Sequence, residues 1–281
     1  MPGDEVLLPV LRSTHLCRGM LTIFWLATSA PMLCAQERII SLAPHTTELV
    51  YALGVGDKLV AVSDYSNFPE EASLLPSVAN HNGVDFEQIM RLQPDLILAW
   101  RGGNKPQDLA RLRSLGYKLY YSNPIIPADI SSELRQLGAL LGKSERGIEM
   151  ADAFSSEMEN IKIQYRSENK IAVFYYMWPS PLMTIGGKAW ANQLLDICGA
   201  RNIFDDAPTP YPEVNMEQVI RRKPHKIIAA MHTSLADADT FWRTKVGTMP
   251  IQLVVVDPDQ LHRFTPRLTS GLKNLCQQLH E

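Results

Sequence analysis

The chain has 281 residues, of which 46% are hydrophobic, a formal net charge of −3 and a sequence pI near 6.2. This length can hold two domains of ordinary size, and the hydrophobic share is enough to give each a core. The slightly acidic balance, without a basic tract, argues against a nucleic-acid-binding protein.

The first 35 residues differ in character from the rest and predict a secretory signal. Basic and titratable residues come first: Arg12, His15 and Arg18. An apolar run over residues 20–33 follows, and it ends in the small-residue segment Cys34–Gln36. The run is too short for a comfortable membrane span, so we expect residues 1–35 to be a signal peptide, cleaved after Ala35.

Three alternatives remain for this leader. Cys34 can be lipidated, although Pro31–Cys34 is a poor lipobox. Met20 can be the true start, although that start would remove the basic region. A buried N-terminal helix is the least favoured, because Pro31 interrupts it.

From Arg38 the sequence alternates apolar strands with amphipathic helices, which predicts an α/β fold with largely parallel sheets. We expect an N-terminal lobe over residues 36–143 and a C-terminal lobe over 168–281. The predicted strands are 39–43, 59–63, 96–100, 118–122, 171–176, 227–231 and 253–256. The predicted helices are 46–53, 106–115, 129–141, 189–198, 237–245 and 266–279, with one short helix in each repeat described below.

A longer helix is predicted over residues 144–165, within a connecting segment 144–167. Apolar residues recur in it at three- and four-residue spacing: Ile148, Ala151, Phe154, Met158, Ile161 and Tyr165. Because no flexible linker intervenes, this helix is expected to join the two lobes rigidly, with a ligand cleft between them.

One helix-to-strand unit occurs twice, at residues 84–99 and again at 214–229. Such self-similarity indicates two lobes of related design. In each copy an N-cap residue (Asp85, Asn215) is followed three residues later by a glutamine (Gln88, Gln218) that is expected to complete a capping box. The prolines expected to end the two helices are Pro94 and Pro224.

Glu87 and Glu217 lie in the first turns of these two helices, 130 positions apart. An acid in a first turn is favoured by the helix dipole by about 0.3 to 1 kcal/mol, which suffices to explain either glutamate alone. That preference does not explain why the pair occupies corresponding corners of two lobes.

Removal of the leader would leave two cysteines, Cys198 and Cys276, in a compartment that permits oxidation. A bridge between them would close a long loop and contribute about 4 kcal/mol in the chain-entropy model. The alternative is two buried thiols. We favour the bridge, because it would tie the last helix to its own lobe.

The segments beyond the strand ends, where α/β sheets bind their ligands, are rich in aromatic residues. Rings held on rigid strand ends offer a large flat apolar surface, and Arg101, Asp259 and Arg263 can fix a polar rim. Ordinary packing remains the alternative for any single ring. The segments in question are 63–69, 100–104, 176–179, 210–212 and 257–263.

Signatures of catalysis are weaker than this pattern. The sequence has no Gly-x-Ser-x-Gly elbow, no phosphate-binding Gly-x-x-x-x-Gly-Lys and no His-Glu-x-x-His. Four histidines lie next to predicted strands: His45, His81, His232 and His262. An exported metal-dependent enzyme therefore stays an alternative, but we expect no enzyme, no resident metal and no cofactor.

Several segments together resemble the solute-binding proteins of ABC importers for iron chelates and corrinoids. The resemblance extends over residues 38–281 and includes the helical bridge. Its corrinoid branch is indicated by the Trp100–Asn104 segment, the cysteine pair, and Asp259 and Arg263 followed by Pro266 and Arg267. The more general motifs are at residues 39–48, 94–97 and 198–204.

The resemblance implies that the protein carries cobalamin (vitamin B12) in the periplasm. Tyr65, Trp100 and Tyr211 match aromatic positions that pack on the corrin, and Asp259 and Arg263 match polar residues at its edge. A tryptophan is expected where the chain has His81, and Trp178 aligns only approximately with another ring position. A haem or ferric-siderophore carrier of the same family is the alternative.

The resemblance also implies partners. Glu87 and Glu217 match surface glutamates that dock onto arginines of a transmembrane permease, which a cytoplasmic ATPase powers. Cys198 and Cys276 match a disulfide pair. The protein itself is expected to be a monomer.

Overall fold

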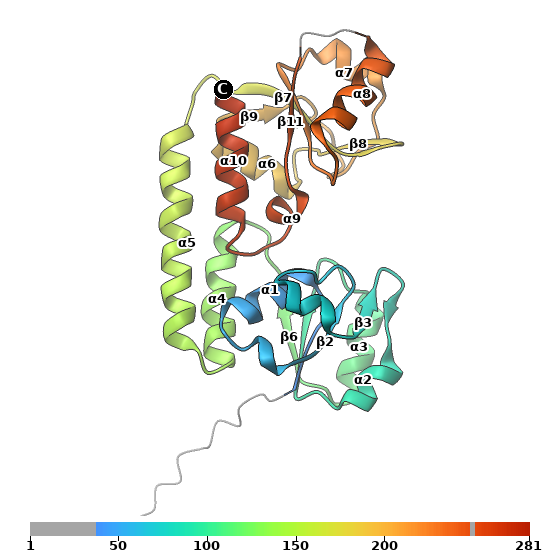
Figure 1. The fold of residues 1–281 in the computed structure, drawn as a ribbon, viewed down its shortest axis with the longest axis vertical. Helices are drawn as coiled ribbons and strands as arrows, with labels where there is room; N and C mark the ends of the chain where they lie inside the picture. The colour runs from blue at the N-terminus through green and yellow to red at the C-terminus, as the bar shows by residue number, and fades with distance from the viewer. Residues whose placement is uncertain (1–37, 248–250) are drawn as a thin grey trace, which may run out of the picture. The chain divides into compact units, whose positions relative to one another are not determined.

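A computed structural model of the protein describes residues 38–247 and 251–281, which belong to one compact unit (Figure 1). The predicted signal peptide, Cys34, Ala35 and the alternative start at Met20 lie outside the described residues.

The N-terminal lobe is built on a six-stranded sheet of order β4-β3-β2-β1-β5-β6. All neighbours are parallel except β3 and β4, which form an antiparallel hairpin. The strands are β1 (Ile39–Ser41), β2 (Leu59–Ser63), β3 (Ser77–Asn80), β4 (Gly83–Val84), β5 (Leu96–Trp100) and β6 (Leu119–Ser122). The helices are α1 (Pro44–Ala52), α2 (Phe86–Leu92), α3 (Pro106–Ser114) and α4 (Ala128–Leu140), with 3-10 turns η1 (Gly56–Lys58) and η2 (Glu70–Leu74).

The C-terminal lobe is built on a five-stranded sheet, in which β11-β10-β7-β8 is the main order and β9 also pairs with β7. Only β8 runs antiparallel to its neighbour. The strands are β7 (Ile171–Pro179), β8 (Leu182–Thr184), β9 (Ala200–Asn202), β10 (Lys226–Ala229) and β11 (Gln252–Val255). The helices are α6 (Trp190–Ile197), α7 (Met216–Arg222), α8 (Leu235–Val246), α9 (Pro258–Leu261) and α10 (Leu268–His280).

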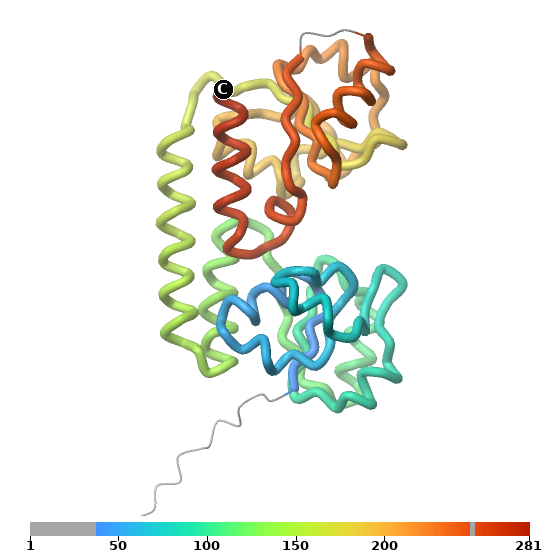
Figure 2. The backbone as a smooth tube through the Cα atoms, in the orientation of Figure 1, coloured from blue at the N-terminus to red at the C-terminus, as the bar shows by residue number. Residues whose placement is uncertain are grey.

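Helix α5 (Ser144–Tyr165) joins the two sheets with the bounds that the sequence predicted, and Figure 2 follows the chain from α4 through α5 to β7. It buries Gly147, Ala151, Phe154 and Ile161, against α4 and α10. The predicted apolar stripe is wrong at Ile148, which is 48% exposed. The buried face instead includes Gly147, because α4 approaches there closely.

The repeated unit forms the same structure in both lobes. Asp85 and Asn215 cap α2 and α7 by accepting from the amides of Gln88 and Gln218, at 3.0 and 2.8 Å. The full capping box forms only in the second copy, where the Gln218 side chain accepts from the Asn215 amide at 2.9 Å. Each helix ends, just before its proline, in a residue with a left-handed backbone conformation: Gln93 has φ at 46° and Lys223 has φ at 48°.

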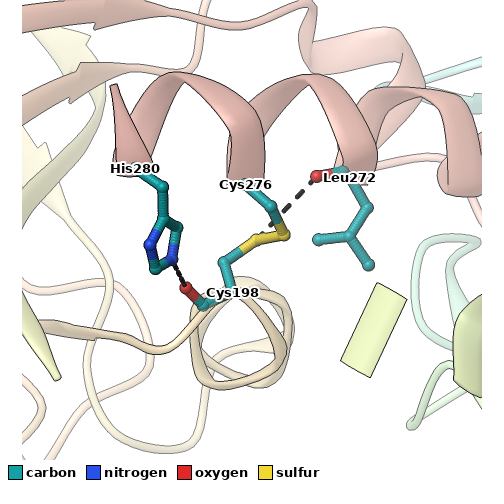
Figure 3. Close-up of a disulfide and its surroundings, with 4 residues drawn as sticks. All are labelled: Cys198, Leu272, Cys276 and His280. Atoms are coloured by element: carbon teal, nitrogen blue, oxygen red, sulfur yellow. Dashed lines mark hydrogen bonds between the residues drawn. A yellow bond between two sulfur atoms is a disulfide. The ribbon is translucent and has the colours of Figure 1, made fainter. Parts of the chain in front are cut away.

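Cys198 and Cys276 form a disulfide, which confirms the bridge and excludes two free thiols (Figure 3). It joins the C-terminal end of α6 to α10 across 78 positions of sequence. One turn further along α10, a hydrogen bond of 2.8 Å joins His280 Nε2 to the Cys198 carbonyl. The last helix is thus fixed to its own lobe.

Within 38–247 and 251–281, we find no helix that combines the length and the apolar character needed to cross a bilayer.

Candidate functional site

Tyr65 follows β2 in a left-handed backbone conformation, with φ at 63°. Its side chain is 80% exposed, so the ring buries almost nothing within the protein. A left-handed conformation is costly for a residue other than glycine and marks a position that its surroundings impose. Tyr65 is therefore held in place while its ring remains available to a ligand.

Trp100, the last residue of β5, is half buried in a turn shaped around its ring. A Cβ atom added at Gly102 would lie 2.8 Å from the indole nitrogen, and one at Gly103 would lie 2.0 Å from a ring carbon. The two glycines are required because the indole lies against the backbone that follows it. Asn104 closes the turn by accepting from the Trp100 amide at 2.7 Å and donating to the Leu42 carbonyl at 2.9 Å.

The indole also contacts His45 and Phe264, both edge-on, with ring centroids 5.3 and 5.8 Å away. His45 lies in the first turn of α1, whereas Phe264 precedes α10, so this cluster of rings includes residues of both lobes. Such edge-to-face contacts fix ring orientation as well as burying area. Trp100 is thereby fixed in orientation, and only part of its surface stays accessible.

His45 is buried and is joined to a short polar chain. Its Nε2 lies 2.7 Å from the Ser122 hydroxyl, which also lies 2.7 Å from the Glu133 carboxylate. Burial, followed by the charge of Arg263, lowers the pKa of His45 to about 3, so the ring is neutral at pH 7. Burial raises the pKa of Glu133, while its hydrogen bond from Ser122 opposes that shift.

Asp259 and Arg263 lie on and just after α9, where the resemblance placed the edge of the ligand. Their side chains are joined at 2.9 Å, and the Arg263 side chain is only 10% exposed. Its guanidinium also reaches residues of the N-terminal lobe: Glu48 Oε1 at 2.8 Å, Asn67 Oδ1 at 2.8 Å and the Tyr65 carbonyl at 3.1 Å. Arg263 thus connects Asp259 with the loop that carries Tyr65.

The remaining predicted ring positions are exposed. Trp178 is 57% exposed and Tyr211 is 51% exposed. Trp178 lies within β7, which is three residues longer than predicted, and not beyond its end. His81 is exposed in the turn between β3 and β4, where the Asn82 amide donates to Asn80 Oδ1 at 2.8 Å. Among the described residues, Arg263 directly contacts Tyr65 and Asp259. The side chains of Trp178, Tyr211 and His81 take no part in these contacts.

The four histidines beside the strands do not form one metal site within the described residues. His262 is bonded to the Tyr175 hydroxyl at 2.6 Å, and burial lowers its pKa to about 4 although Asp259 opposes that shift. Across the described part of the chain, the single cluster with metal-binding potential combines His232 with Asp257 and Asp259. His232 and Asp257 are exposed there, and His45 and His81 lie outside the cluster.

Glu87 and Glu217 are exposed in the first turns of α2 and α7, as their positions in the repeat predict. Glu87 also forms an ion pair with Arg91 one turn along, at 2.5 Å, with both side chains more than 70% exposed. Such a solvated pair contributes little to stability. Both glutamates therefore remain accessible to a partner.

A cavity of about 780 Å³ lies elsewhere, lined by residues of α4, α5 and α6 that include Ser131, Phe154 and Asn192. None of the predicted site residues lines it. The ligand site predicted from the sequence is therefore separate from this cavity.

Sequence reasoning missed Glu48 and Phe264 as members of the site. Glu48 is buried in α1, where Leu49 and Val50 follow it, and a buried acid is itself a signal of a buried partner. Phe264 lies in a loop, where no periodic pattern could indicate that it packs on Trp100.

The model of the periplasmic binding protein family matches residues 39–246. A curated relative from Vibrio parahaemolyticus serotype O3:K6, named vitamin B12-binding protein, is 36% identical over 245 residues, which cover 86% of this chain and 88% of the relative.

Two solved structures have the same fold. The periplasmic vitamin B12 binding protein BtuF of Vibrio cholerae is 38% identical, with a TM-score of 0.80 over 87% of this chain and 97% of that one. The periplasmic haem-binding protein RhuT from Roseiflexus sp. RS-1 has a TM-score of 0.78 over 88% of this chain and 98% of its own, but at 22% identity it supports the fold alone. Since the family model and the relatives span most of the sequence, the chain belongs to the periplasmic binding protein family.

Proposed function

We propose that the protein captures cobalamin in the periplasm, without chemical conversion, and delivers it to the permease of an ABC importer. The observation that carries the proposal is the 36% to 38% identity to vitamin B12-binding proteins over most of the chain. Three exposed rings support it: Tyr65, Trp178 and Tyr211.

The geometry is suited to a broad, flat, largely apolar ligand. Exposed aromatic side chains leave apolar area in contact with water. Stacking on a corrin ring would bury that area, at a low cost in conformational entropy. Trp100 has its orientation fixed beforehand by His45 and Phe264, which reduces the entropy lost on binding. Asp259, whose partner Arg263 is buried, offers a polar group near the rim.

Calorimetric titration with cyanocobalamin, haem and a ferric siderophore tests the proposal directly. We expect one cyanocobalamin per protein and no comparable binding of the other two. Tyr65→Ala and Tyr211→Ala should each weaken binding about five- to tenfold, since an aromatic contact contributes roughly 0.5–1.5 kcal/mol beyond its area. Tight haem binding with no corrinoid binding would favour the haem carrier, and turnover of a substrate would favour the metal-dependent enzyme.

His81 takes part in this proposal as a ligand contact in place of a tryptophan ring. An imidazole offers less apolar stacking area but can donate to a corrinoid side chain or approach its metal. We expect His81→Trp to bind cyanocobalamin more tightly by calorimetry. An absorption spectrum and a pH response identical to those of the parent complex would exclude coordination of the cobalt by His81.

Delivery would use Glu87 and Glu217, one on each lobe. Exposed carboxylates on two rigid helices can pair with arginines of a permease, and such charge complementarity orients a partner more than it adds affinity. We further propose that the protein is a monomer with a cleaved signal peptide, and that a cytoplasmic ATPase powers the importer.

A further inference from the structure

The loop that presents Tyr65 has few bonds of its own. Ser66 is bonded through its hydroxyl to Ser63 and Thr47, both at 3.1 Å, and its amide donates to the Ser63 carbonyl at 3.2 Å. These contacts hold the base of the loop. Further out, the Asn67 amide donates to the Tyr65 carbonyl at 2.9 Å, but this bond joins two residues of the loop to one another and does not attach them to the rest of the lobe.

Two arginines of the C-terminal lobe hold the outer part of this loop. Arg263 donates to the Tyr65 carbonyl at 3.1 Å and to Asn67 Oδ1 at 2.8 Å. The guanidinium of Arg267 lies 3.8 Å from the centroid of the Phe68 ring. Each of the residues Tyr65, Asn67 and Phe68 is therefore contacted by an arginine from the other lobe.

Glu48 is the anion that brings these two arginines together. Its Oε1 accepts from Arg263 at 2.8 Å and from Arg267 at 3.0 Å, and its side chain is only 3% exposed. Asp259 contacts Arg263 alone. Two guanidinium groups held close together in a largely buried place repel one another, and the Glu48 carboxylate between them offsets this repulsion. Without that carboxylate, the arginine side chains would have to move toward water to be solvated.

We propose that Glu48 is a positioning residue of the ligand site, which acts through Arg263 and Arg267 to hold Tyr65 in its ligand-facing conformation. The carboxylate need not touch the ligand. Its role is to keep both arginines on the loop, so that the exposed Tyr65 ring occupies one orientation before the corrinoid arrives. We call Glu48, Arg263 and Arg267 the clamp. The inference rests on the proposed function for the nature of the ligand, but the contacts of the clamp are independent of it.

The test is a double-mutant cycle with Glu48→Gln and Tyr65→Ala, measured by calorimetry with cyanocobalamin. In the parent protein we expect Glu48→Gln to weaken binding about tenfold, within the coupling energies found for residues of one network. In the Tyr65→Ala background the same change should weaken binding less than about twofold, because the ring to be positioned is gone. Equal losses in both backgrounds would overturn the proposal.

Leu112→Ala is the matched control for a general loss of stability. Leu112 is fully buried in α3 of the same lobe, in an apolar cluster that includes Ile97 and Leu109. Its effect on cyanocobalamin binding should be the same with and without the Tyr65 ring. If Glu48→Gln fails to fold, Arg267→Gln serves in its place, since that side chain is 24% exposed and its loss leaves Arg263 bound to Glu48. It should show the same non-additivity.

Hydrogen exchange of the ligand-free protein separates failure of the clamp from failure of the proposed function. Amides of residues 66–68 should exchange about tenfold faster in Glu48→Gln, while Leu112→Ala should raise exchange no more there than elsewhere in the lobe. Faster exchange without cyanocobalamin binding by the parent protein would retain the clamp and reject the ligand. Unchanged exchange at residues 66–68 would reject the clamp.

Discussion

At the scale of single residues, the site depends on how Trp100 is held. The indole lies close to the backbone of Gly102 and Gly103 and also contacts the rings of His45 and Phe264. A side chain that is already fixed by its neighbours can offer its free surface to a ligand without first losing conformational freedom. The glycines of this turn are thus part of the site although they carry no side chain.

Gly103→Ala tests this arrangement. The new Cβ would lie 2.0 Å from a ring carbon of Trp100, so the indole must move. Overpacking of this kind costs about 1–3 kcal/mol, and we expect cyanocobalamin to bind about tenfold more weakly by calorimetry. In a Trp100→Ala background the same substitution should have almost no effect on affinity. A loss of similar size in that background would show that the turn, and not the ring, is responsible.

His45 makes the stability of the protein depend on pH. Its pKa in the folded protein is about 3, below the ordinary value of 6.5, so the unfolded chain binds more protons between these limits. The stability that neutral His45 contributes is therefore fully present above pH 6.5 and is lost as the pH falls toward 3. The loss from His45 is about 1.4 kcal/mol per pH unit, or about 2 kcal/mol at pH 5.

Urea unfolding of His45→Gln between pH 7 and 5 measures this contribution. Glutamine does not titrate and keeps a polar group beside Ser122, so the fall in free energy of unfolding should be less steep than in the parent protein. His225→Gln, at an exposed position, is the control and should follow the parent curve. Identical slopes for all three proteins would mean that His45 is protonated in the folded state at pH 5.

At the scale of elements, α4 and α5 pack through two glycines. A Cβ on Gly138 would lie 2.9 Å from the Gly147 Cα, and one on Gly147 would lie 2.5 Å from the Leu134 carbonyl. Both obstacles are backbone atoms, which a side-chain rotation cannot move. This close approach fixes the spacing of the helix pair that leads from the first lobe to the second.

Gly147→Ala should therefore destabilise the protein, although alanine is the better helix former. Within a free helix the change would stabilise by about 0.5–1 kcal/mol. Against the Leu134 carbonyl we expect a net loss of about 1–3 kcal/mol in urea unfolding, because backbone must move. Ser156→Ala, exposed on the same helix, should change stability by less than about 0.5 kcal/mol. A gain in stability from Gly147→Ala would contradict this packing.

At the scale of the whole molecule, the sequence predicted the elements whose signals are local. Capping residues and prolines set the ends of α2 and α7, and apolar runs identified β5 and β10. Strands β3, β4, β8 and β9 were missed, because segments of two to four residues carry no readable period.

Sequence patterns pointed to single side chains of the candidate site, but not to the contacts between them. Tyr65 and Tyr211 were predicted as rings that face a ligand; both are exposed in the structure, and their role in binding stays a prediction. The bond from Arg263 to Glu48 spans 215 positions, and no spacing rule connects residues so far apart. Arg263 therefore looked like a free group at the ligand's edge, whereas its guanidinium is occupied by the other lobe.

The repeat at residues 84–99 and 214–229 is a property of the whole molecule, because it gives each lobe an exposed glutamate on an equivalent helix. If docking requires both, replacing Glu87 and Glu217 together by alanine should leave cyanocobalamin affinity and the unfolding curve unchanged. Uptake of labelled cyanocobalamin by cells carrying the importer should nevertheless fall by at least about tenfold, since each charged pair lost from an interface typically costs a kcal/mol or more.

A variant with equal loss of charge provides the control. Glu145 and Glu149 are exposed on α5, and replacing both by alanine removes two negative charges from a different surface. If docking depends on position, this variant should support normal uptake; if net charge alone steers the protein, both double variants should lose uptake alike, and more so at low ionic strength. Loss of cyanocobalamin binding in the Glu87 and Glu217 variant would instead place these residues at the ligand site. Normal uptake by the Glu87 and Glu217 double variant would show that neither glutamate is needed for docking, because uptake would then proceed without the two carboxylates that are proposed to pair with permease arginines.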